Sequence, residues 1–436
     1  MMESIWQSGL KRPCFESLKG DTKTDVLIIG GGITGLLCGY MLKESGADYL
    51  IVEADKILNG ITKNTTAKIT IAHGLIYSKI EKSYGIKAAE LYYRSQNEAL
   101  KKYFELSKKH SCDFTKRDNV VYSRDNKEAI QKEIEVLSKI GAKAEFLNEL
   151  PLAFSVAGAV KTENQAEFNP LKFGFSIAKG LNICENTKVL QIGENAVVTN
   201  KGKIHAKRIV VATHFPFLNK HGGYFLKLYQ HRSYVLAIKD APTIDAMYVD
   251  ENIKGLSFRD YNGLLLLGGG SHRTGKKGGN WTELERFTKQ NYKNAKIVSR
   301  WATQDCMSLD SIAYIGRYSK NTPNLYVATG FNKWGMTSSM TAAMLLRDLL
   351  TGRQNEYEEL YSPDRKMLHP QLFANCFESV SGLLRPTAPR CPHMGCALIY
   401  NKHEHSWDCS CHGSRFKENG ELIDNPATDD KKGLSH

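Results

Sequence analysis

The sequence predicts an α/β protein with a parallel sheet, a second region rich in strands and a small C-terminal module. Three observations support this prediction. A short apolar run, a glycine-rich turn and a helical stretch follow one another between residues 26 and 45. Apolar runs typical of strands recur at Val156–Val160, Val189–Val198, Tyr234–Ile238 and Gly255–Gly269. Cysteine and histidine pairs gather between residues 391 and 414.

The composition is that of a folded protein of two or three domains, because the chain has 436 residues, of which 42% are hydrophobic. The N-terminus has no basic segment followed by an apolar core, so no secretory signal is predicted. The longest apolar stretch, Val26 to Leu42, is interrupted by glycines, which argues against a membrane span. Six scattered cysteines are expected to be reduced thiols, and we therefore expect a cytoplasmic protein.

The net charge of +13 comes from lysines spread singly along the chain. The sequence has no arginine-rich arm and no basic run interleaved with aromatic residues, so nucleic-acid binding is not expected. A basic surface of this kind would attract an acidic redox protein as a partner.

The apolar run Val26–Ile29 is followed by a G-x-G-x-x-G motif. Gly30 permits a tight turn, Gly32 lets a pyrophosphate approach the N-terminus of a helix, and Gly35 lets that helix pack on the strand. A second apolar run ends at Glu53, whose carboxylate suits ribose hydroxyls. The strand, the helix and an acid about 20 residues further on predict a Rossmann-like dinucleotide site rather than a turn without a ligand.

Several later segments resemble the D-amino-acid-oxidase-like family of FAD-dependent oxidoreductases. They follow the family's order and span roughly residues 20 to 365. The resemblance implies FAD rather than NAD, bound by a domain of the glutathione-reductase type into which an antiparallel substrate sheet is inserted. The matching segments are Gly60–Lys68 with His73-Gly74, Ile209–Thr213, Ser308–Asp310, Tyr314–Arg317 and Leu325–Met336.

The glycine motif and this resemblance together imply a set of FAD contacts. The expected contacts are Gly30, Gly32, Ile33, Thr34, Gly35, Glu53, Ala54, Thr62, Thr65, Thr66, Val189, Ala212, Thr213, Gly330, Trp334, Gly335 and Met336.

The segment from Tyr224 to about Arg273 corresponds to the family's substrate sheet, which covers the face of the flavin. An arginine there would hold a substrate carboxylate by two hydrogen bonds, and His73 is expected beside the flavin ring. Each polar residue taken alone is more often a structural hydrogen-bonding group. The expected catalytic residues are His73, His231, Arg259 and His272, with Arg232, Tyr234, Tyr248, Tyr261 and Arg273 as further candidates.

The C-terminal sequences CPHMGC and CSCHGS place two thiols and two imidazoles in a C-x-H … C-x-x-H pattern. These residues suit a tetrahedral zinc ion, although zinc needs only four ligands and the two matched loops offer six. The loops resemble the Rieske iron–sulfur motif. That resemblance implies a [2Fe–2S] cluster held by Cys391, His393, Cys409 and His412, with a Cys396–Cys411 disulfide bracing the loops.

The C-terminal module departs from the Rieske pattern in two ways. About 25 residues separate the flavoprotein from Cys391, so the strands that usually precede the first ligand loop are shortened or absent. Ser410 stands where proline is usual. A module of this size would lean on the flavoprotein for support.

The predicted domains are an FAD-dependent oxidoreductase at 1–365, a linker at 366–385 and a Rieske-like module at 386–436. The FAD part is expected at about 20–80, 150–220 and 305–365, and the substrate part at about 81–150 and 221–304.

The two expected cofactors predict an enzyme that oxidises a small molecule of the amine or amino-acid type. FAD accepts a hydride, whereas a [2Fe–2S] cluster moves one electron at a time, so electrons would pass singly through the cluster to an unknown acceptor. Two alternatives remain open. One is a flavin oxidase that uses O₂ and carries a structural metal tail; the other is a flavin- and cluster-bearing sensor or electron carrier without turnover.

Overall fold

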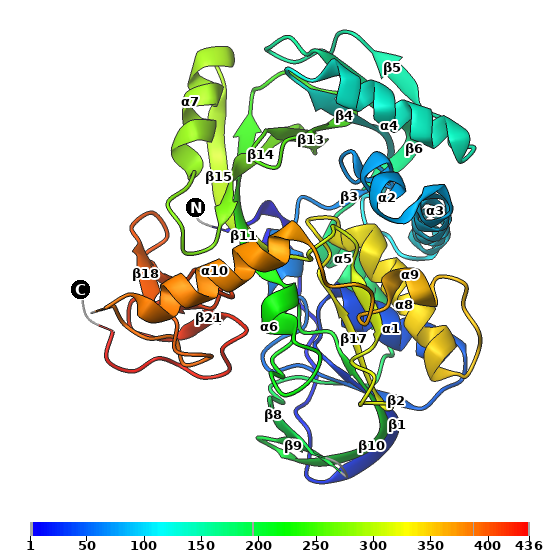
Figure 1. Ribbon diagram of the computed structural model, residues 1–436, viewed down its shortest axis with the longest axis vertical. Helices are drawn as coiled ribbons and strands as arrows, with labels where there is room; N and C mark the ends of the chain where they lie inside the picture. The colour runs from blue at the N-terminus through cyan, green and yellow to red at the C-terminus, as the bar shows by residue number, and fades with distance from the viewer. Residues whose placement is uncertain (1–2, 194–195, 387, 435–436) are drawn as a thin grey trace.

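The computed structural model describes residues 3–193, 196–386 and 388–434. Its strands form three sheets of eight, nine and four strands. Figure 1 shows the eight-stranded sheet below the nine-stranded sheet, with the four-stranded sheet to one side of the junction between them. Within the described residues, no helix is both long and apolar enough to cross a bilayer.

The eight-stranded sheet contains β1 (Thr22–Ile29), β2 (Tyr49–Val52), β7 (Ile183–Cys184), β8 (Val189–Ile192), β9 (Val197–Thr199), β10 (Gly202–Val211), β16 (Tyr314–Arg317) and β17 (Leu325–Thr329). Strands β7, β2, β1, β10 and β17 are parallel neighbours, so their carboxyl ends meet at one edge. Strand β16 joins β17 antiparallel, and β8 and β9 form a meander beside β10. This is the parallel sheet that the glycine motif predicts.

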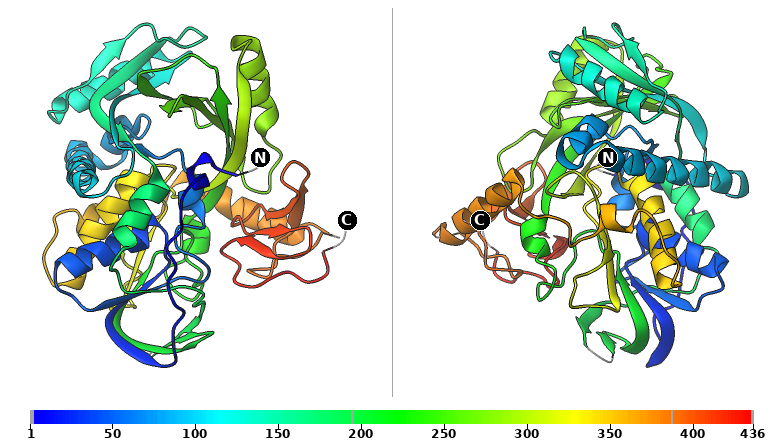
Figure 2. Two further views of the ribbon diagram at one scale, coloured as in Figure 1. Left: turned by 180° about the vertical axis from the view of Figure 1, so that it is seen from behind. Right: turned by 45° about the vertical axis from the view of Figure 1, so that its right-hand side comes forward.

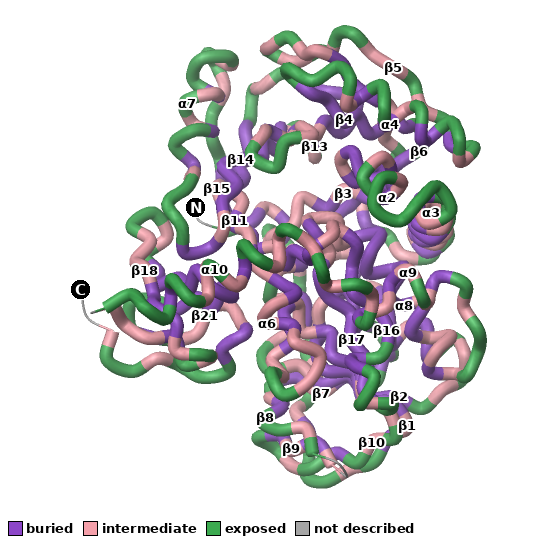
Figure 3. The backbone as a smooth tube through the Cα atoms, in the orientation of Figure 1, coloured by how far each residue is buried: buried purple, intermediate pink, exposed green. Residues whose placement is uncertain are grey.

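The described residues form ten α-helices and two 3₁₀ helices. Helix α1 begins directly after the glycine turn and packs on α8, which in turn contacts α3. The largest apolar core lies between these helices and the parallel sheet, as the buried residues in Figure 3 show. The helices are α1 (Ile33–Glu44), α2 (Ile76–Tyr84), α3 (Ile86–Lys109), α4 (Lys127–Lys139), α5 (Pro170–Ala178), α6 (Tyr224–Lys227), α7 (Trp281–Asn291), α8 (Gly335–Leu350), α9 (Glu358–Tyr361) and α10 (Pro370–Leu384), with η1 (Ile5–Gln7) and η2 (Ile61–Asn64).

The nine-stranded sheet contains β3 (Lys68–Ile69), β4 (Thr115–Ser123), β5 (Glu145–Leu147), β6 (Gly158–Glu167), β11 (Tyr229–Lys239), β12 (Ala246–Asp250), β13 (Ser257–Tyr261), β14 (Leu264–Arg273) and β15 (Lys296–Met307). All its pairs are antiparallel except β4 with β12. Helix α7 packs on β11 and β14, and α4 packs on β5 and β6. The nine-stranded sheet includes the antiparallel sheet expected from the family resemblance.

Two predicted strands are each divided in two. The run Gly255–Gly269 contains β13 and β14, because Asn262 and Gly263 both have positive φ and form a two-residue hairpin turn. The run Val189–Val198 contains β8 and the start of β9.

Two parts of the predicted domain division differ from the structure. Strands β3 and β6 come from ranges expected in the FAD part, yet both belong to the nine-stranded sheet. The expected linker 366–385 contains α10, which begins with Pro370 and is capped by the His369 ring accepting from the Gln371 N–H.

The C-terminal module is a four-stranded antiparallel sheet of β18 (Leu398–Asn401), β19 (Ser406–Cys409), β20 (Arg415–Lys417) and β21 (Leu422–Asp424). The only described helix between the flavoprotein and this sheet is α10. Figure 2 shows the module, coloured orange to red, against the side of the molecule that carries α6 and the ends of β11 and β15. The module thus lies beside both larger sheets.

Candidate functional site: a dinucleotide cavity beside a cysteine–histidine centre

A cavity of about 730 Å³ lies between the carboxyl edge of the parallel sheet and the nine-stranded sheet. The ends of β1, β2 and β10 line one side, and β11, β14 and β15 line the other. Residues 422–425 of the C-terminal module also reach its wall. The cavity is therefore walled by all three sheets.

The glycine turn at the end of β1 brings open backbone to this cavity. Gly30 has φ +112°, and a Cβ there would lie 2.6 Å from the carbonyl oxygen of Ala212. Gly32 borders the cavity, and the nearest atom to a Cβ built on it is Thr62 Oγ1, at 3.7 Å. Gly32 is also the N-cap residue of α1, so the space beside it faces a helix N-terminus, which attracts phosphate oxygens. This arrangement fits the pyrophosphate of a dinucleotide.

Glu53, at the end of β2, lines the same wall. Its Oε2 accepts from the Gly31 N–H at 2.7 Å and its Oε1 from the Asp55 N–H at 3.0 Å. Burial raises the pKa of this carboxyl, and these backbone N–H groups oppose the rise. Each carboxylate oxygen keeps a lone pair for a ribose hydroxyl.

The structure gathers nearly all the expected FAD contacts around the cavity. Among the described residues, Gly35 and Gly330 are the expected contacts that do not line it. Gly35 instead packs α1 on β1, because a Cβ there would lie 1.9 Å from the Gly30 carbonyl oxygen. The contacts that line the cavity are Gly30, Gly32, Ile33, Thr34, Glu53, Ala54, Thr62, Thr65, Thr66, Val189, Ala212, Thr213, Trp334, Gly335 and Met336.

Of the four expected catalytic residues, His73 is the one that lines the cavity within the described chain. Its Nδ1 hydrogen-bonds the Tyr92 hydroxyl at 2.6 Å, and its Nε2 lies 2.8 Å from the Thr70 carbonyl and 2.9 Å from Thr337 Oγ1. Its ring stacks on Trp334 with centroids 5.0 Å apart. Burial lowers the pKa of His73 to about 3, so the ring is neutral. Both nitrogens already have partners, which favours a structural role.

The other three expected catalytic residues do not line the cavity. Arg259 is fully buried, donates to the Thr66 and Ala67 carbonyls, and forms an ion pair with Glu167 at 3.2 Å. It therefore positions the segment that lines the cavity. His272 stacks on the Tyr234 ring, and neither His272 nor His231 belongs to the lining as the structure describes it.

Sequence reasoning did not single out two charged residues of the cavity, Lys333 and Asp305. The Lys333 ammonium donates to the hydroxyls of Ser233 on β11, at 3.2 Å, and Ser271 on β14. Burial lowers the pKa of Lys333 and raises that of Asp305, which lies on β15. Lys333 also has φ +72°, a backbone conformation that the sequence alone did not signal.

The two cysteine–histidine loops face each other at one end of the small sheet. The first loop closes through the Cys391 N–H to the Cys396 carbonyl, at 2.8 Å, and the second through the Cys409 N–H to the Ser414 carbonyl, at 2.9 Å. Strands β18 and β19 hold the loops together, since Leu398 pairs with Cys409.

The expected cluster ligands converge between these loops. The rings of His393 and His412 lie 4.9 Å apart, and the Nδ1 atom of each is buried without a hydrogen-bond partner. The thiols of Cys391 and Cys409 interact, which raises the pKa of Cys391 and lowers that of Cys409. Unpaired imidazole nitrogens beside clustered thiols fit a metal centre with mixed sulfur and nitrogen ligands.

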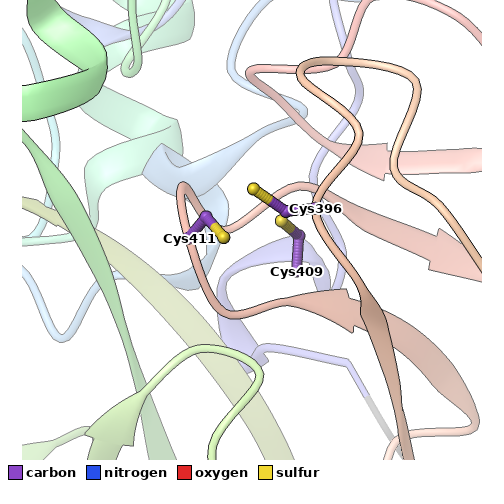
Figure 4. Close-up of side chains that lie close together, drawn as sticks. All are labelled: Cys396, Cys409 and Cys411. Atoms are coloured by element: carbon purple, nitrogen blue, oxygen red, sulfur yellow. The ribbon is translucent and has the colours of Figure 1, made fainter. Parts of the chain in front are cut away.

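The cysteines expected to brace the loops are close but not bonded. The Sγ atoms of Cys396, Cys409 and Cys411 lie within 4.8 Å of one another (Figure 4). All ten cysteines of the chain are among the described residues, and each is a free thiol. The structure therefore lacks the expected Cys396–Cys411 disulfide, and its formation in the protein stays a prediction.

The second ligand loop is held by the ends of β11, β14 and β15. Gln230 Nε2 donates to the His412 carbonyl at 2.8 Å, and Gln304 Nε2 to the Gly413 carbonyl at 2.9 Å. The Arg273 guanidinium donates to the carbonyls of Ser410, at 3.0 Å, and Cys411, at 3.1 Å. These bonds are the support from the flavoprotein that the short module was expected to need.

Residues 25–349 match the family of FAD-dependent oxidoreductases called DAO. The chain belongs to this family. Residues 368–434 match the Rieske [2Fe–2S] domain, so the enzyme is a DAO-family oxidoreductase with a C-terminal Rieske domain. Its cofactors are FAD and a [2Fe–2S] cluster, which the glycine-lined cavity and the cysteine–histidine loops fit.

Relatives of this oxidoreductase share one or both domains. A Bacillus subtilis (strain 168) protein named for a Rieske 2Fe–2S centre, YhfW, is 34% identical over an alignment covering 98% of this chain and 96% of the relative. Gamma-glutamylputrescine oxidoreductase of Escherichia coli (strain K12) is 25% identical, covering 79% of this chain and 87% of the relative. Glycine oxidase of Geobacillus kaustophilus has the same fold, with a TM-score of 0.66 and 17% identity, covering 79% of this chain and 99% of that structure.

Proposed function

We propose that this protein is a dehydrogenase that oxidises a small amine or amino acid and passes the electrons through its Rieske domain to a separate acceptor. The observation that carries the proposal is that three strands each reach both sites. Strand β11 presents Ser233 to the cavity and Gln230 to the second ligand loop. Strand β14 presents Ser271 to the cavity and Arg273 to that loop. Strand β15 presents Asp305 to the cavity and Gln304 to the loop.

Positions up to three residues apart on a strand are separated by about 10 Å at most. FAD, when bound, takes a hydride from a C–H bond, and a [2Fe–2S] cluster supplies one-electron transfer. The short path along these strands favours use of both centres in one reaction.

The charged groups of the cavity suit an amino acid or amine. The ammonium of Lys333 is positioned to hold a carboxylate, and the carboxylate of Asp305 to hold a substrate ammonium. Asp305 lies on β15, and the Lys333 ammonium contacts β11 and β14, so both charged groups lie on the side of the cavity formed by the nine-stranded sheet, where partial burial strengthens electrostatic attraction. The names of the relatives, which include a gamma-glutamylputrescine oxidoreductase and a glycine oxidase, support this substrate class.

A variant that lacks the cluster tests the electron route. In Cys391→Ala/His393→Ala, FAD content and anaerobic reduction of the flavin by the substrate should be unchanged. Electron delivery to the acceptor should fall at least about tenfold, and the Rieske signal in low-temperature EPR should disappear. Cys376→Ala, which removes a free thiol on α10, is the matched control.

Two results would contradict the proposal. Normal reoxidation of the flavin by the cellular acceptor in the cluster-free variant would remove the cluster from the route. Formation of one peroxide per substrate oxidised by the wild-type protein would instead identify an O₂-using oxidase.

A further inference from the structure

Helix α10 turns an apolar stripe toward solvent. Phe373, Phe377, Val380 and Leu384 are 64%, 71%, 54% and 76% exposed. Their spacing of four, three and four residues places them on one face of the helix. A surface helix of a globular protein normally points such a stripe at the core. Helix α10 is therefore oriented the opposite way, with its apolar face toward solvent and a polar residue, Asn375, on its buried face.

Polar contacts fix this inverted orientation. The buried face of α10 carries Asn375, which donates to the Leu226 carbonyl at 3.0 Å and accepts from Arg273 at 2.9 Å. Glu378 forms an ion pair with Lys276 at 2.6 Å. Rotation of the helix to bury its apolar stripe would break these contacts.

The helix also lies directly on the cluster-binding loops. A Cβ at Gly382 would lie 2.5 Å from Cys411 Sγ, and the Gly382 carbonyl accepts from the Ala397 N–H, just after the first ligand loop, at 3.0 Å. Met394, within that loop, is exposed. We call the exposed apolar set the α10 ridge; it consists of Leu368, Phe373, Phe377, Val380, Leu383, Leu384 and Met394.

The exposed charges around the α10 ridge are mainly basic. Lys366 and Arg385 flank the two ends of the helix and are exposed. Lys220 follows Asn219, whose side chain hydrogen-bonds the His393 ring at 2.9 Å. The one acidic residue of the helix, Glu378, is neutralised by Lys276, and Asp364 is an exposed acid before its start. With a net charge of +13, the protein presents a surface that suits an anionic partner.

We propose that the α10 ridge binds the surface of an anionic lipid bilayer. A row of protruding aromatic and aliphatic side chains with basic neighbours is the pattern of helices that lie in the membrane interface. Helix α10 lies on the outside of the molecule (Figures 1 and 2), and a fluid interface accepts exposed apolar side chains without a matching groove. A second copy of this chain would instead bring its basic residues against one another.

Vesicle flotation of the holoenzyme tests this proposal. The probes are vesicles of phosphatidylcholine alone and of equal parts phosphatidylcholine and phosphatidylglycerol, with bound protein followed by its flavin absorbance. The wild-type protein should bind the anionic vesicles at least about tenfold more tightly than the neutral ones. Binding should weaken when salt rises from about 0.1 M to about 1 M, because screening shortens the reach of the charges.

The variant Phe373→Ser/Phe377→Ser should bind anionic vesicles at least about tenfold more weakly, since inserting one phenylalanine contributes roughly that factor. Both side chains are exposed, so the flavin spectrum and the thermal transition should match those of the wild type. Leu190→Ser/Ile297→Ser removes two exposed apolar side chains on β8 and β15 and should bind like the wild type.

Three outcomes would overturn the proposal. The first is a wild-type protein that does not bind anionic vesicles. The second is equal binding by the Phe373→Ser/Phe377→Ser variant. The third is a wild-type dimer in size-exclusion chromatography that this variant converts to a monomer, because a second copy would then cover the ridge.

Discussion

Two glycines of the motif, Gly32 and Gly35, have separable roles at the scale of single residues. Gly35→Ala should destabilise the protein by at least about 2 kcal/mol, because its methyl group would overlap the Gly30 carbonyl. Gly32→Ala should cost less than about 1 kcal/mol, since the space beside it is open. Its methyl group would, however, occupy the space expected for the pyrophosphate and lower FAD affinity at least about tenfold.

Thermal unfolding of the apoprotein and FAD titration distinguish these effects. If Gly32→Ala bound FAD as tightly as the wild type, the glycine turn would not be the pyrophosphate site.

The residues of the cavity differ in whether the sequence alone can identify their roles. The roles of Gly30, Gly32 and Glu53 depend on local backbone geometry and on short spacing, so a motif encodes them. The positions of Lys333, in the turn after β17, and of Asp305, on β15, depend on which segments face the cavity, a tertiary property that no local pattern contains. Arg259 carries the charge expected of a substrate ligand. It is buried, however, and its guanidinium group donates to the Thr66 and Ala67 carbonyls instead of facing the cavity.

At the scale of elements, the spacing of apolar residues indicates that a segment is helical more reliably than it indicates which face of that helix is buried. Helix α3 agrees with this rule in both respects, because its apolar residues repeat at helical spacing and pack inward. Helix α10 was expected to be part of a linker, although its apolar residues also repeat at helical spacing. Its stripe faces solvent, so the usual inference from periodicity to a buried face does not apply to it.

The turn between β18 and β19 fastens the module to the nine-stranded sheet through Glu404. Its carboxylate accepts from Arg232 on β11 and from Arg415 on β20, and all three side chains are buried. Burial by itself would raise the pKa of Glu404, but the two guanidinium groups lower it to about 2. A carboxyl group with a lowered pKa stabilises the fold above its unfolded pKa, and this contribution is lost as the pH falls.

We call Glu404 with its two arginines the Glu404 clamp. This clamp should therefore weaken between about pH 4.5 and about pH 2, with a loss of about 3 kcal/mol in the free energy of unfolding. Glu404→Gln should lose a similar amount at neutral pH, because it leaves two buried guanidinium groups short of a counter-charge. Other carboxyl groups also titrate in acid, so the informative quantity is the difference between the two proteins. That difference should shrink as the pH falls; a constant difference would show that Glu404 does not carry the charge of the clamp.

At the scale of the whole molecule, the module and the flavoprotein form one structural unit. The Rieske domain has no described strand before its first ligand loop, and its second ligand loop hydrogen-bonds Gln230, Gln304 and Arg273 of the flavoprotein. Asn425 of the module donates to the Thr213 and Phe215 carbonyls at the edge of the parallel sheet. The sequence indicated a shortened module, but the residues that replace its missing support come from distant parts of the chain and could be identified only from the structure.

This dependence predicts that Arg273 couples the two centres. Arg273→Met would leave the Ser410 and Cys411 carbonyls without this donor and the Asn375 side chain with Gln371 alone as its donor, so the second ligand loop should move away from β14. In stopped-flow measurements, reduction of the flavin by the substrate should keep its rate, whereas delivery of electrons to the Rieske domain should slow at least about tenfold.

Lys239→Met, which removes a positive charge from the far end of β11, should leave both rates unchanged. Arg273→Lys should restore part of the slow rate, because an ammonium group can still donate to a carbonyl. Equal transfer rates in Arg273→Met and the wild type would mean that the contact positions the module without contributing to electron transfer.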